Sequence, residues 1–323
     1  MAKTRVLQPD SNGIGEAVRL LHDGALVAFP TETVYGLGAD ARNGEAVAGI
    51  FAAKGRPSFN PLIVHVASLD AAEELVELPP ELRNLGLAFW PGAITLVAPL
   101  RPASGLSDLV SAGLPTIAVR VPSHPLALSI LETFGGPVAA PSANPSGQIS
   151  PTTSDHVMDG LNGKIAAVVN GGACAVGLES TIVGYGANGA VLLRPGGVPS
   201  EAIEAALGQP LLPATPDKIE APGQMLSHYA PSSQLRMNAD APTGSEAYLA
   251  FGNSEGLPNC LDLSKSGDLR EAASNLFAHL RDLDAMVTAQ NLTGIAACPI
   301  PETGLGLAIN DRLNRASAPK TDG

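Results

Sequence analysis

The sequence predicts an α/β protein with one large, mostly buried sheet and a second, smaller α/β unit. Three observations support this fold class. Short aliphatic runs alternate with amphipathic stretches of helical period through the first part of the chain. Glycine and proline are frequent, at 35 and 28 of 323 residues, as expected of short strands joined by tight loops. A proline-rich stretch then precedes a further strand and helix pattern.

The larger unit begins with a helix and continues with strands and helices in alternation. Ile14, Ala17, Val18 and Leu21 have helical spacing, and Gly24 follows as a stop signal. The other expected elements of this unit, residues 1–208, are a strand at 25–29, a helical stripe at 46–51 ended by Gly55, a strand at 62–66, a helix at 70–78 stopped by Pro79 and Pro80, strands at 117–121, 138–140 and 166–169, and a helix at 200–207.

Residues 209–244 differ from both flanking regions because prolines punctuate them. We expect a semi-rigid, extended linker without regular elements. The segment 245–323 then predicts a small second α/β unit, with strands at 247–251 and 294–298 and helices at 271–290 and 304–317.

Composition limits the possible functions. The net charge of -12 argues against a broad basic surface for tight nucleic-acid binding, although a local basic pocket remains compatible with it. The widely spaced Cys174, Cys260 and Cys298 give neither a disulfide framework nor a zinc spacing. No apolar run reaches the ~18 residues of a membrane span, and the N-terminus lacks a signal-peptide core. We therefore expect a cytoplasmic protein without membrane association.

Polar clusters stand at the ends of the expected strands, where α/β folds bind ligands. They are PTETVYGLG (30–38), which ends in an expected glycine-rich turn, KGRPSFNP (54–61) with His65, Thr116 with Arg120, PSANPSG (141–147) followed by Ser150, LESTIV (178–183) and LLRPGG (192–197). Four of only 19 basic residues lie in these clusters, namely Lys54, Arg56, Arg120 and Arg194. Convergent Lys and Arg favour a polyphosphate or carboxylate ligand.

The sequence has no P-loop, no G-x-S-x-G elbow, no H-E-x-x-H and no Cys/His nucleophile setting. This favours phosphoryl or nucleotidyl chemistry that depends on positioning and charge neutralisation. Each cluster also has an ordinary structural explanation. Lys54 could complement a helix dipole, His65 could be a hydrogen-bonded core histidine, PSANPSG could be a turn, and Glu179 could be a solvated carboxylate.

Taken in order, these segments resemble the YrdC/Sua5 family over roughly residues 10–208. WPGAITLV (90–97) and TIAVRVPSHP (116–125) belong to the same resemblance, and the family's K-x-R and S-x-N pairs correspond to Lys54/Arg56 and Ser142/Asn144. SHYAP (227–231) resembles the linker motif of the long Sua5 form, and GLGLAINDRLNRAS (304–317) resembles the end of its Rossmann-like second domain. The resemblance implies a mixed, twisted sheet of the α+β type with a concave pocket.

The same resemblance implies a threonylcarbamoyl-AMP synthase, a nucleotidyltransferase. Such an enzyme converts L-threonine, bicarbonate or CO2, and ATP into threonylcarbamoyl-adenylate and diphosphate. Downstream transferase proteins would then modify the tRNA adenosine beside the anticodon to t6A, with at most weak direct contact between this chain and tRNA. The resemblance also implies Mg2+ bound with ATP and no dedicated metal site in the protein.

The resemblance assigns site residues one by one. A catalytic group would comprise Lys54, Arg56, Ser142 and Asn144. L-Threonine would be bound by Thr33, His65, Arg120, Ala140 and Ser180. ATP would be bound by Lys54, Arg56, Asn60, Thr116, Ser142, Asn144, Ser150, Arg194, His228 and Tyr229. The linker would fold over the pocket mouth, although Gln224–Ser227 depart from the K-Y-R pattern usual before that histidine.

Three other functions remain open. One is an RNA-binding accessory factor of the same fold without synthase activity. Another is a carbamoyl-adenylate domain for hydrogenase maturation, against which the absence of CxxC pairs counts. The third is a nucleotide-binding scaffold whose second unit is the working part.

Overall fold

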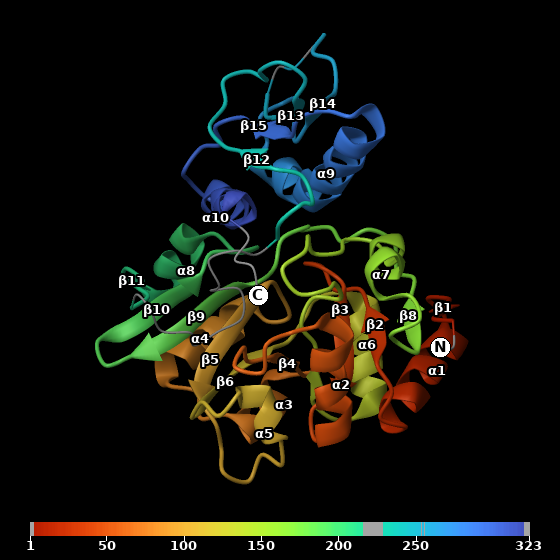
Figure 1. Ribbon diagram of the computed structural model, residues 1–323. Coiled ribbons are helices and arrows are strands. Elements are labelled where there is room, and N and C mark those ends of the chain that lie inside the picture. The colour runs from red at the N-terminus through yellow and green to blue at the C-terminus, as the bar shows by residue number, and fades with distance from the viewer. Residues whose placement is uncertain (1–2, 216–228, 253, 255, 320–323) are drawn as a thin grey trace.

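The computed structural model of the chain describes residues 3–215, 229–252, 254 and 256–319. Figure 1 shows a larger unit and, packed against one side of it, a smaller unit formed by the end of the chain. The larger unit contains a mixed sheet and the smaller one a parallel sheet, each with helices, so the predicted fold class is confirmed.

The larger unit is built on an 11-stranded sheet with the order β1-β8-β2-β3-β7-β4-β6-β5-β9-β10-β11. Non-consecutive neighbours bring loops from distant parts of the sequence to the same region of the sheet. The strands are β1 (Arg5–Leu7), β2 (Val27–Phe29), β3 (Gly36–Asp40), β4 (Ile63–His65), β5 (Ile94–Pro99), β6 (Thr116–Arg120), β7 (Val138–Ala139), β8 (Ala167–Val169), β9 (Thr181–Gly186), β10 (Gly189–Arg194) and β11 (Leu212–Pro213).

Helices cover the two faces of this sheet unequally. The main core, on one face, includes side chains of α2 (Gly44–Lys54), α3 (Leu69–Leu75), α4 (Pro80–Phe89), α5 (Asp108–Ser111), α7 (Ser154–Leu161) and α8 (Ser200–Leu207). On the other face, α1 (Ser11–His22) and α6 (Pro125–Phe134) pack near β2 and β8. A separate small apolar cluster lies on that second face further along the sheet, around Val97 and Ile182.

His65 and Arg120 interrupt the apolar surface of this second face. Val64 and Val119 belong to the main core, whereas Ile63 belongs to the small cluster on the opposite face. Side chains alternate along a strand, so His65 shares the face of Ile63. The parallel pairing of β4 with β6 sets His65 directly beside Arg120. The two-residue period of a strand predicts from the sequence alone that His65 lies opposite Val64 and that Arg120 lies opposite Val119, and the structure confirms both.

The smaller unit contains a four-stranded, all-parallel sheet with the order β12-β15-β13-β14. Its elements are β12 (Leu235–Arg236), β13 (Ala247–Ala250), β14 (Cys260–Asp262), α9 (Leu269–Gln290), β15 (Ile295–Ala297) and α10 (Leu305–Ser317). Asp268 caps α9 by accepting from the N–H groups of Arg270 and Glu271. Within the described part of the chain, no helix is long and apolar enough to cross a membrane.

Three sequence predictions about elements were wrong. The helix expected at 70–78 ends at Leu75, and Pro80 begins α4, because proline fits the first turn of a helix. The expected glycine-rich turn after Tyr35 is strand β3, in which Gly38 leaves room for the Phe29 ring, 2.6 Å from where a Cβ would lie. The expected linker contains β11, paired with β10, and β12, paired with β15. The division at 208 and 244 stays a prediction.

The two units share a buried boundary. One apolar cluster joins Val34, Ile149 and Leu178 of the larger unit to the buried side of α9. Gly177 lies at this boundary with φ of +72°, and a Cβ there would be 2.5 Å from the Cα of Ser274. The absence of a side chain at Gly177 therefore allows the loop before β9 to touch the backbone of α9.

Gly177→Ala should destabilise the protein by about 3 kcal/mol or more, because backbone strain adds to a clash with the α9 main chain. Gly172→Ala is the matched control, since Gly172 has φ of +78° but nothing within 4 Å of the new Cβ. It should cost only about 1 kcal/mol. Urea unfolding of both variants measures the difference, and equal losses would show that the contact with α9 is unimportant.

Candidate active site

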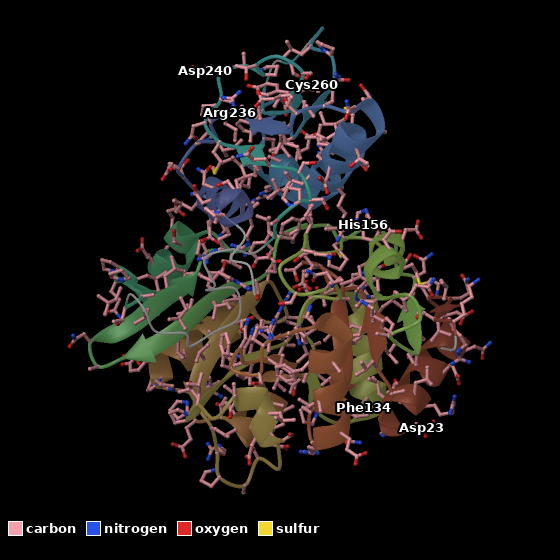
Figure 2. All side chains as sticks on the ribbon, viewed as in Figure 1. Asp23, Phe134, His156, Arg236, Asp240 and Cys260 are labelled. Atoms are coloured by element: carbon pink, nitrogen blue, oxygen red, sulfur yellow. The ribbon has the colours of Figure 1, made fainter. Side chains whose placement is uncertain are left out.

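A cavity opens on the second face of the sheet, where the ends of β4 and β6 meet loops from six other parts of the chain. Figure 2 shows side chains filling the region between the two units, with His156 of α7 on the larger unit's side. The residues that line the cavity are Thr31, Thr33, Val34, Gly36, Arg56, Ile63, His65, Arg120, Ala140, Pro141, Ser142, Glu179, Ser180, Arg194 and Tyr229.

Arg120 is held in a fixed orientation at the end of β6. Its Nη2 donates to Glu32 Oε1 at 2.6 Å, Nη1 donates to Thr33 Oγ1 at 2.9 Å, and Nε donates to the main-chain oxygen of Gly92 at 3.1 Å. Burial works to raise the pKa of Glu32, but the attraction of Arg120 outweighs it and the pKa is lowered. The carboxylate is therefore ionised, and Arg120 lines the cavity as the cation of this pair.

His65 is buried beside Arg120 and carries no charge at neutral pH. Burial, followed by repulsion from Arg120, lowers the pKa of His65 to about 3. Its Nδ1 has no hydrogen-bond partner among the described residues. The cavity thus contains a neutral imidazole nitrogen that a bound ligand could satisfy.

Arg194 and Ser180 form a second polar wall from β10 and the start of β9. The pairing of β10 with β9 shifts in register between Leu192 and Arg194, just before the arginine. Arg194 Nη2 donates to the main-chain oxygen of Ser180 at 2.8 Å. The Ser180 hydroxyl oxygen lies 2.7 Å from the hydroxyl oxygen of Thr95 on β5. Thr95 was not among the site residues predicted from the sequence.

Lys54 fastens the PSANPSG segment rather than lining the cavity. Its Nζ donates to the main-chain oxygens of Ser142 and Asn144, both at 2.5 Å. Burial and the neighbouring Arg56 lower the pKa of Lys54 well below its usual value. Ser142 lines the cavity, so Lys54 fixes part of its wall. A direct role for Lys54 with phosphate stays a prediction.

Arg56 follows the left-handed Gly55 that ends α2 and is held by the loop it belongs to. Its Nη2 donates to Asn60 Oδ1 at 2.6 Å and to the main-chain oxygen of Pro61 at 2.8 Å. Burial lowers the pKa of Arg56 to about 10, so it remains a cation at neutral pH. Asn60 therefore acts as a partner of Arg56.

Glu179 connects the cavity to the smaller unit. Its Oε1 accepts from Ser150 Oγ at 2.5 Å, and its Oε2 accepts from Arg312 Nε of α10 at 2.8 Å. Arg312 is fully buried and also donates to Asp311 and to the main-chain oxygen of Pro195. Burial works to raise the pKa of Glu179, but Arg312 and Arg194 lower it on balance. Sequence reasoning assigned a role to neither Glu179 nor Arg312.

Tyr229 is buried at the boundary between the cavity and the smaller unit. Its ring stacks on Phe277 of α9 with 5.6 Å between centroids, and the Arg312 guanidinium lies 5.2 Å from the ring. The next residue, Ala230, donates its N–H to the main-chain oxygen of Gly147 at 2.9 Å. The described end of the linker is thus attached to the PSANPSG loop, whereas His228 lies outside the described residues.

The structure brings most predicted site residues together. Thr33, Arg56, His65, Arg120, Ala140, Ser142, Ser180, Arg194 and Tyr229 line the cavity. Three others do not line the cavity but form hydrogen bonds with residues that do: Lys54 with Ser142, Asn60 with Arg56, and Ser150 with Glu179. Asn144 Nδ2 donates to two loop carbonyls, which leaves the buried Oδ1 without a partner among the described residues. Thr116 begins β6, four residues before Arg120, and does not line this cavity.

Family models and curated relatives match nearly the whole chain. The Sua5_yciO_yrdC model, described as telomere recombination, matches residues 19–196, and the model of the threonylcarbamoyl-AMP synthase C-terminal domain matches residues 198–318. The threonylcarbamoyl-AMP synthase of Bacillus subtilis is 41% identical and covers 97% of this chain and 95% of its own length. That of Pyrococcus abyssi is 41% identical over 93% of each chain.

Solved structures also match the chain. The structure of Pyrococcus abyssi Sua5 complexed with L-threonine has a TM-score of 0.88 at 37% identity and covers 97% of both chains. Escherichia coli YciO has a TM-score of 0.54 at 21% identity over 61% of this chain, a likeness of fold alone.

Protein stability should fall as the pH drops from about 6.5 towards 5, because the folded state resists protonation of His65. In this window the unfolded chain binds the proton and the folded chain does not, so stability is lost as pH falls, by about 1.4 kcal/mol per pH unit. His65→Gln should flatten the slope when urea unfolding is followed at pH 7.5, 6 and 5. An unchanged slope in this variant would contradict the buried, neutral His65.

Proposed function

The chain belongs to the Sua5 family of threonylcarbamoyl-AMP synthases, and we propose that the cavity on the second face of its sheet is where the adenylate forms. L-Threonine, bicarbonate and ATP enter, and threonylcarbamoyl-adenylate, diphosphate and water leave. The observation that carries the proposal is one cavity lined by three buried arginines, several hydroxyls and a neutral histidine.

Arg120 with Thr33 and His65 makes up what we call the amino-acid end of the cavity. The solved relative complexed with L-threonine supports this class of ligand. Arg120 is the natural partner of the substrate carboxylate, because its planar fork binds carboxylates with two hydrogen bonds. The threonine amine has to lose its ammonium proton before it can react. His65 is neutral and so adds no further positive charge beside the amine, and its Nδ1 has no partner within the part of the chain that the structure describes.

Arg56 and Arg194 make up the phosphate end of the cavity. The two arginines lie close enough for Arg194 to contribute, after burial, to the lowered pKa of Arg56. A triphosphate would relieve this repulsion and so be favoured there. Ser142 adds a hydroxyl, and Lys54 holds the Ser142 backbone in place. Asn60, Thr116, Asn144 and Ser150 complete the proposed ATP set, together with Tyr229 and His228.

The reaction requires no nucleophile from the protein. The ammonium proton of threonine converts bicarbonate into CO2 and water. The free amine then attacks CO2 and forms a carbamate, and the proton released passes to solvent. A carbamate oxygen attacks the α-phosphorus of ATP, and the bond from that phosphorus to diphosphate breaks. Arg120 would hold the carboxylate while Arg56 and Arg194 neutralise charge that moves to the leaving diphosphate. Catalysis therefore rests on orientation and preorganised positive charge.

Magnesium would enter with ATP and help neutralise its phosphates. Among the described residues, no group of three or more His, Cys, Asp or Glu could hold a metal ion. Glu32 and Glu179 are each paired with an arginine. Asn144 Oδ1, buried and without a partner there, fits a role as the chain's own oxygen towards the phosphate-bound cation or its water.

We further propose that the product passes to transferase proteins that modify tRNA. The adenylate is a mixed anhydride and hydrolyses in water, so a short path to its acceptor is favourable. The net charge of -12 agrees with tRNA being modified by those partners rather than bound tightly by this chain.

Arg56→Ala should reduce diphosphate release at least a hundredfold, because one preorganised cation at a reacting phosphate contributes about 3 kcal/mol or more. Release is measured with ATP and magnesium, with and without L-threonine and bicarbonate. Arg83→Ala is the control, since Arg83 pairs with Glu73 on the exposed surface. Release from the wild type that does not depend on threonine would contradict the function, and wild-type rates in Arg56→Ala would contradict the site.

A further inference from the structure

One side of α9 contacts two segments that border the cavity. Phe277, Arg281 and Asp284 are spaced four and three residues apart, so their side chains lie on the same side of the helix. Phe277 stacks on Tyr229, which lines the cavity. Arg281 Nη2 donates to the main-chain oxygen of Ile149, just after the PSANPSG segment. The smaller unit therefore has a second route to the cavity, besides the ion pair formed by α10.

The Ile149 carbonyl lies next to the contacts of two residues predicted to bind ATP. Asn144 Nδ2 donates to the main-chain oxygen of Gln148 at 2.8 Å. Ser150 Oγ donates to Glu179 Oε1 at 2.5 Å. Gln148 and Ser150 are the two chain neighbours of Ile149. A group that holds the Ile149 carbonyl therefore also restrains the backbone on which both contacts depend.

The direction of each of these bonds follows from the atoms involved. A main-chain oxygen only accepts, so Arg281 and Asn144 Nδ2 donate to their carbonyl partners. Asn144 Nδ2 also donates to the main-chain oxygen of Pro145, at 3.0 Å. Both N–H groups of the amide are then used, and Oδ1 is an acceptor without a partner among the described residues. Glu179 is ionised, so Ser150 is the donor of the remaining bond. The loop thus sets the direction in which Asn144 Oδ1 points.

Arg281 forms its hydrogen bond to this loop and to nothing else in the described part of the chain. Its Nε is buried and has no partner among the described residues. Burial lowers the pKa of Arg281, and the nearby carboxylates of Asp159 on α7 and Asp284 on α9 oppose this effect. The guanidinium group is therefore attracted by carboxylates of both units and is held at the boundary between them.

The end of the linker lies against the same loop and is attached to the same side of α9. Asp284 accepts from the N–H groups of Ser232 and Ser233 at 2.8 and 2.7 Å, one with each carboxylate oxygen. Ala230 donates its N–H to the main-chain oxygen of Gly147 at 2.9 Å. Two contacts of α9, one direct and one through the linker, thus hold the loop 147–149.

We infer that Arg281 is a positioning residue for ATP, which holds from the smaller unit the loop that orients Asn144 and Ser150. Asp284 supports the same loop through the end of the linker. The inference rests on the proposed function, in which ATP lies beside this loop. None of these contacts involves the amino-acid end of the cavity, so the removal of Arg281 should weaken the binding of ATP and spare that of L-threonine.

The test compares Arg281→Met, which removes the donors, with Arg281→Lys, which keeps a cation and a donor. Arg236→Met is the matched control, because Arg236 forms its hydrogen bonds within the smaller unit, including those to Glu246 and Thr243. A fault in the smaller unit alone should therefore appear in this control. Calorimetric titration measures the affinity of each protein for ATP with magnesium and, separately, for L-threonine.

Arg281→Met should bind ATP about tenfold more weakly, the worth of one hydrogen bond from a charged group, and L-threonine as the wild type does. Arg281→Lys should recover most of the ATP affinity, and Arg236→Met should change neither affinity. An unchanged ATP affinity in Arg281→Met, an equal loss for both ligands, or a loss that Arg236→Met shares would overturn the proposal. If Arg281→Met does not fold, Asp284→Ala replaces it, and an unchanged ATP affinity there overturns the proposal equally.

Titration of ATP without L-threonine and bicarbonate keeps this inference separate from the proposed function. A wild type that binds ATP but releases no diphosphate with all three substrates present would contradict only the synthase proposal. A wild type that releases diphosphate normally, with an unchanged ATP affinity in Arg281→Met, would contradict only the role of Arg281.

Discussion

The buried ion pair between Glu179 and Arg312 is the interaction on which the arrangement of the two units depends. Glu179 lines the cavity, and Arg312 reaches it from α10 of the smaller unit at 2.8 Å. Both residues are buried, so removal of either charge leaves the other poorly compensated. The same guanidinium faces the Tyr229 ring. Beside the apolar cluster at the boundary, this charge pair therefore connects the cavity wall to the smaller unit next to the described end of the linker.

A second constraint is the burial of cations on one face of the sheet. Arg56, Arg120 and Arg194 are each less than 9% exposed, and each donates to oxygen atoms of the protein. These partners hold the guanidinium groups in place before a ligand arrives, so binding requires little reorganisation. The sheet is otherwise aliphatic, and Arg120 and Arg194 stand at the ends of its strands β6 and β10. Neutral His65 lies among the cations without adding to their repulsion.

The sequence predicted the local part of this site better than its long-range connections. The two-residue period of the strands was enough to set His65 and Arg120 on the face opposite the main core. The pairing of Lys54 with the Ser142 and Asn144 backbone spans about 90 residues of sequence and has no periodic signal. The contact of Arg312 with Glu179 spans 133 residues. Its one sequence signal was an arginine inside the apolar pattern of the final helix.

The most direct test of the account is a double-mutant cycle with Glu179→Gln and Arg312→Met. The affinity for ATP and the free energy of unfolding are measured for all four proteins. Each single variant should lose about 3 kcal/mol or more of stability and bind ATP more weakly, and the double variant should lose clearly less than the sum. Additive effects, or full ATP affinity in Arg312→Met, would contradict a smaller unit that shapes the cavity through this pair.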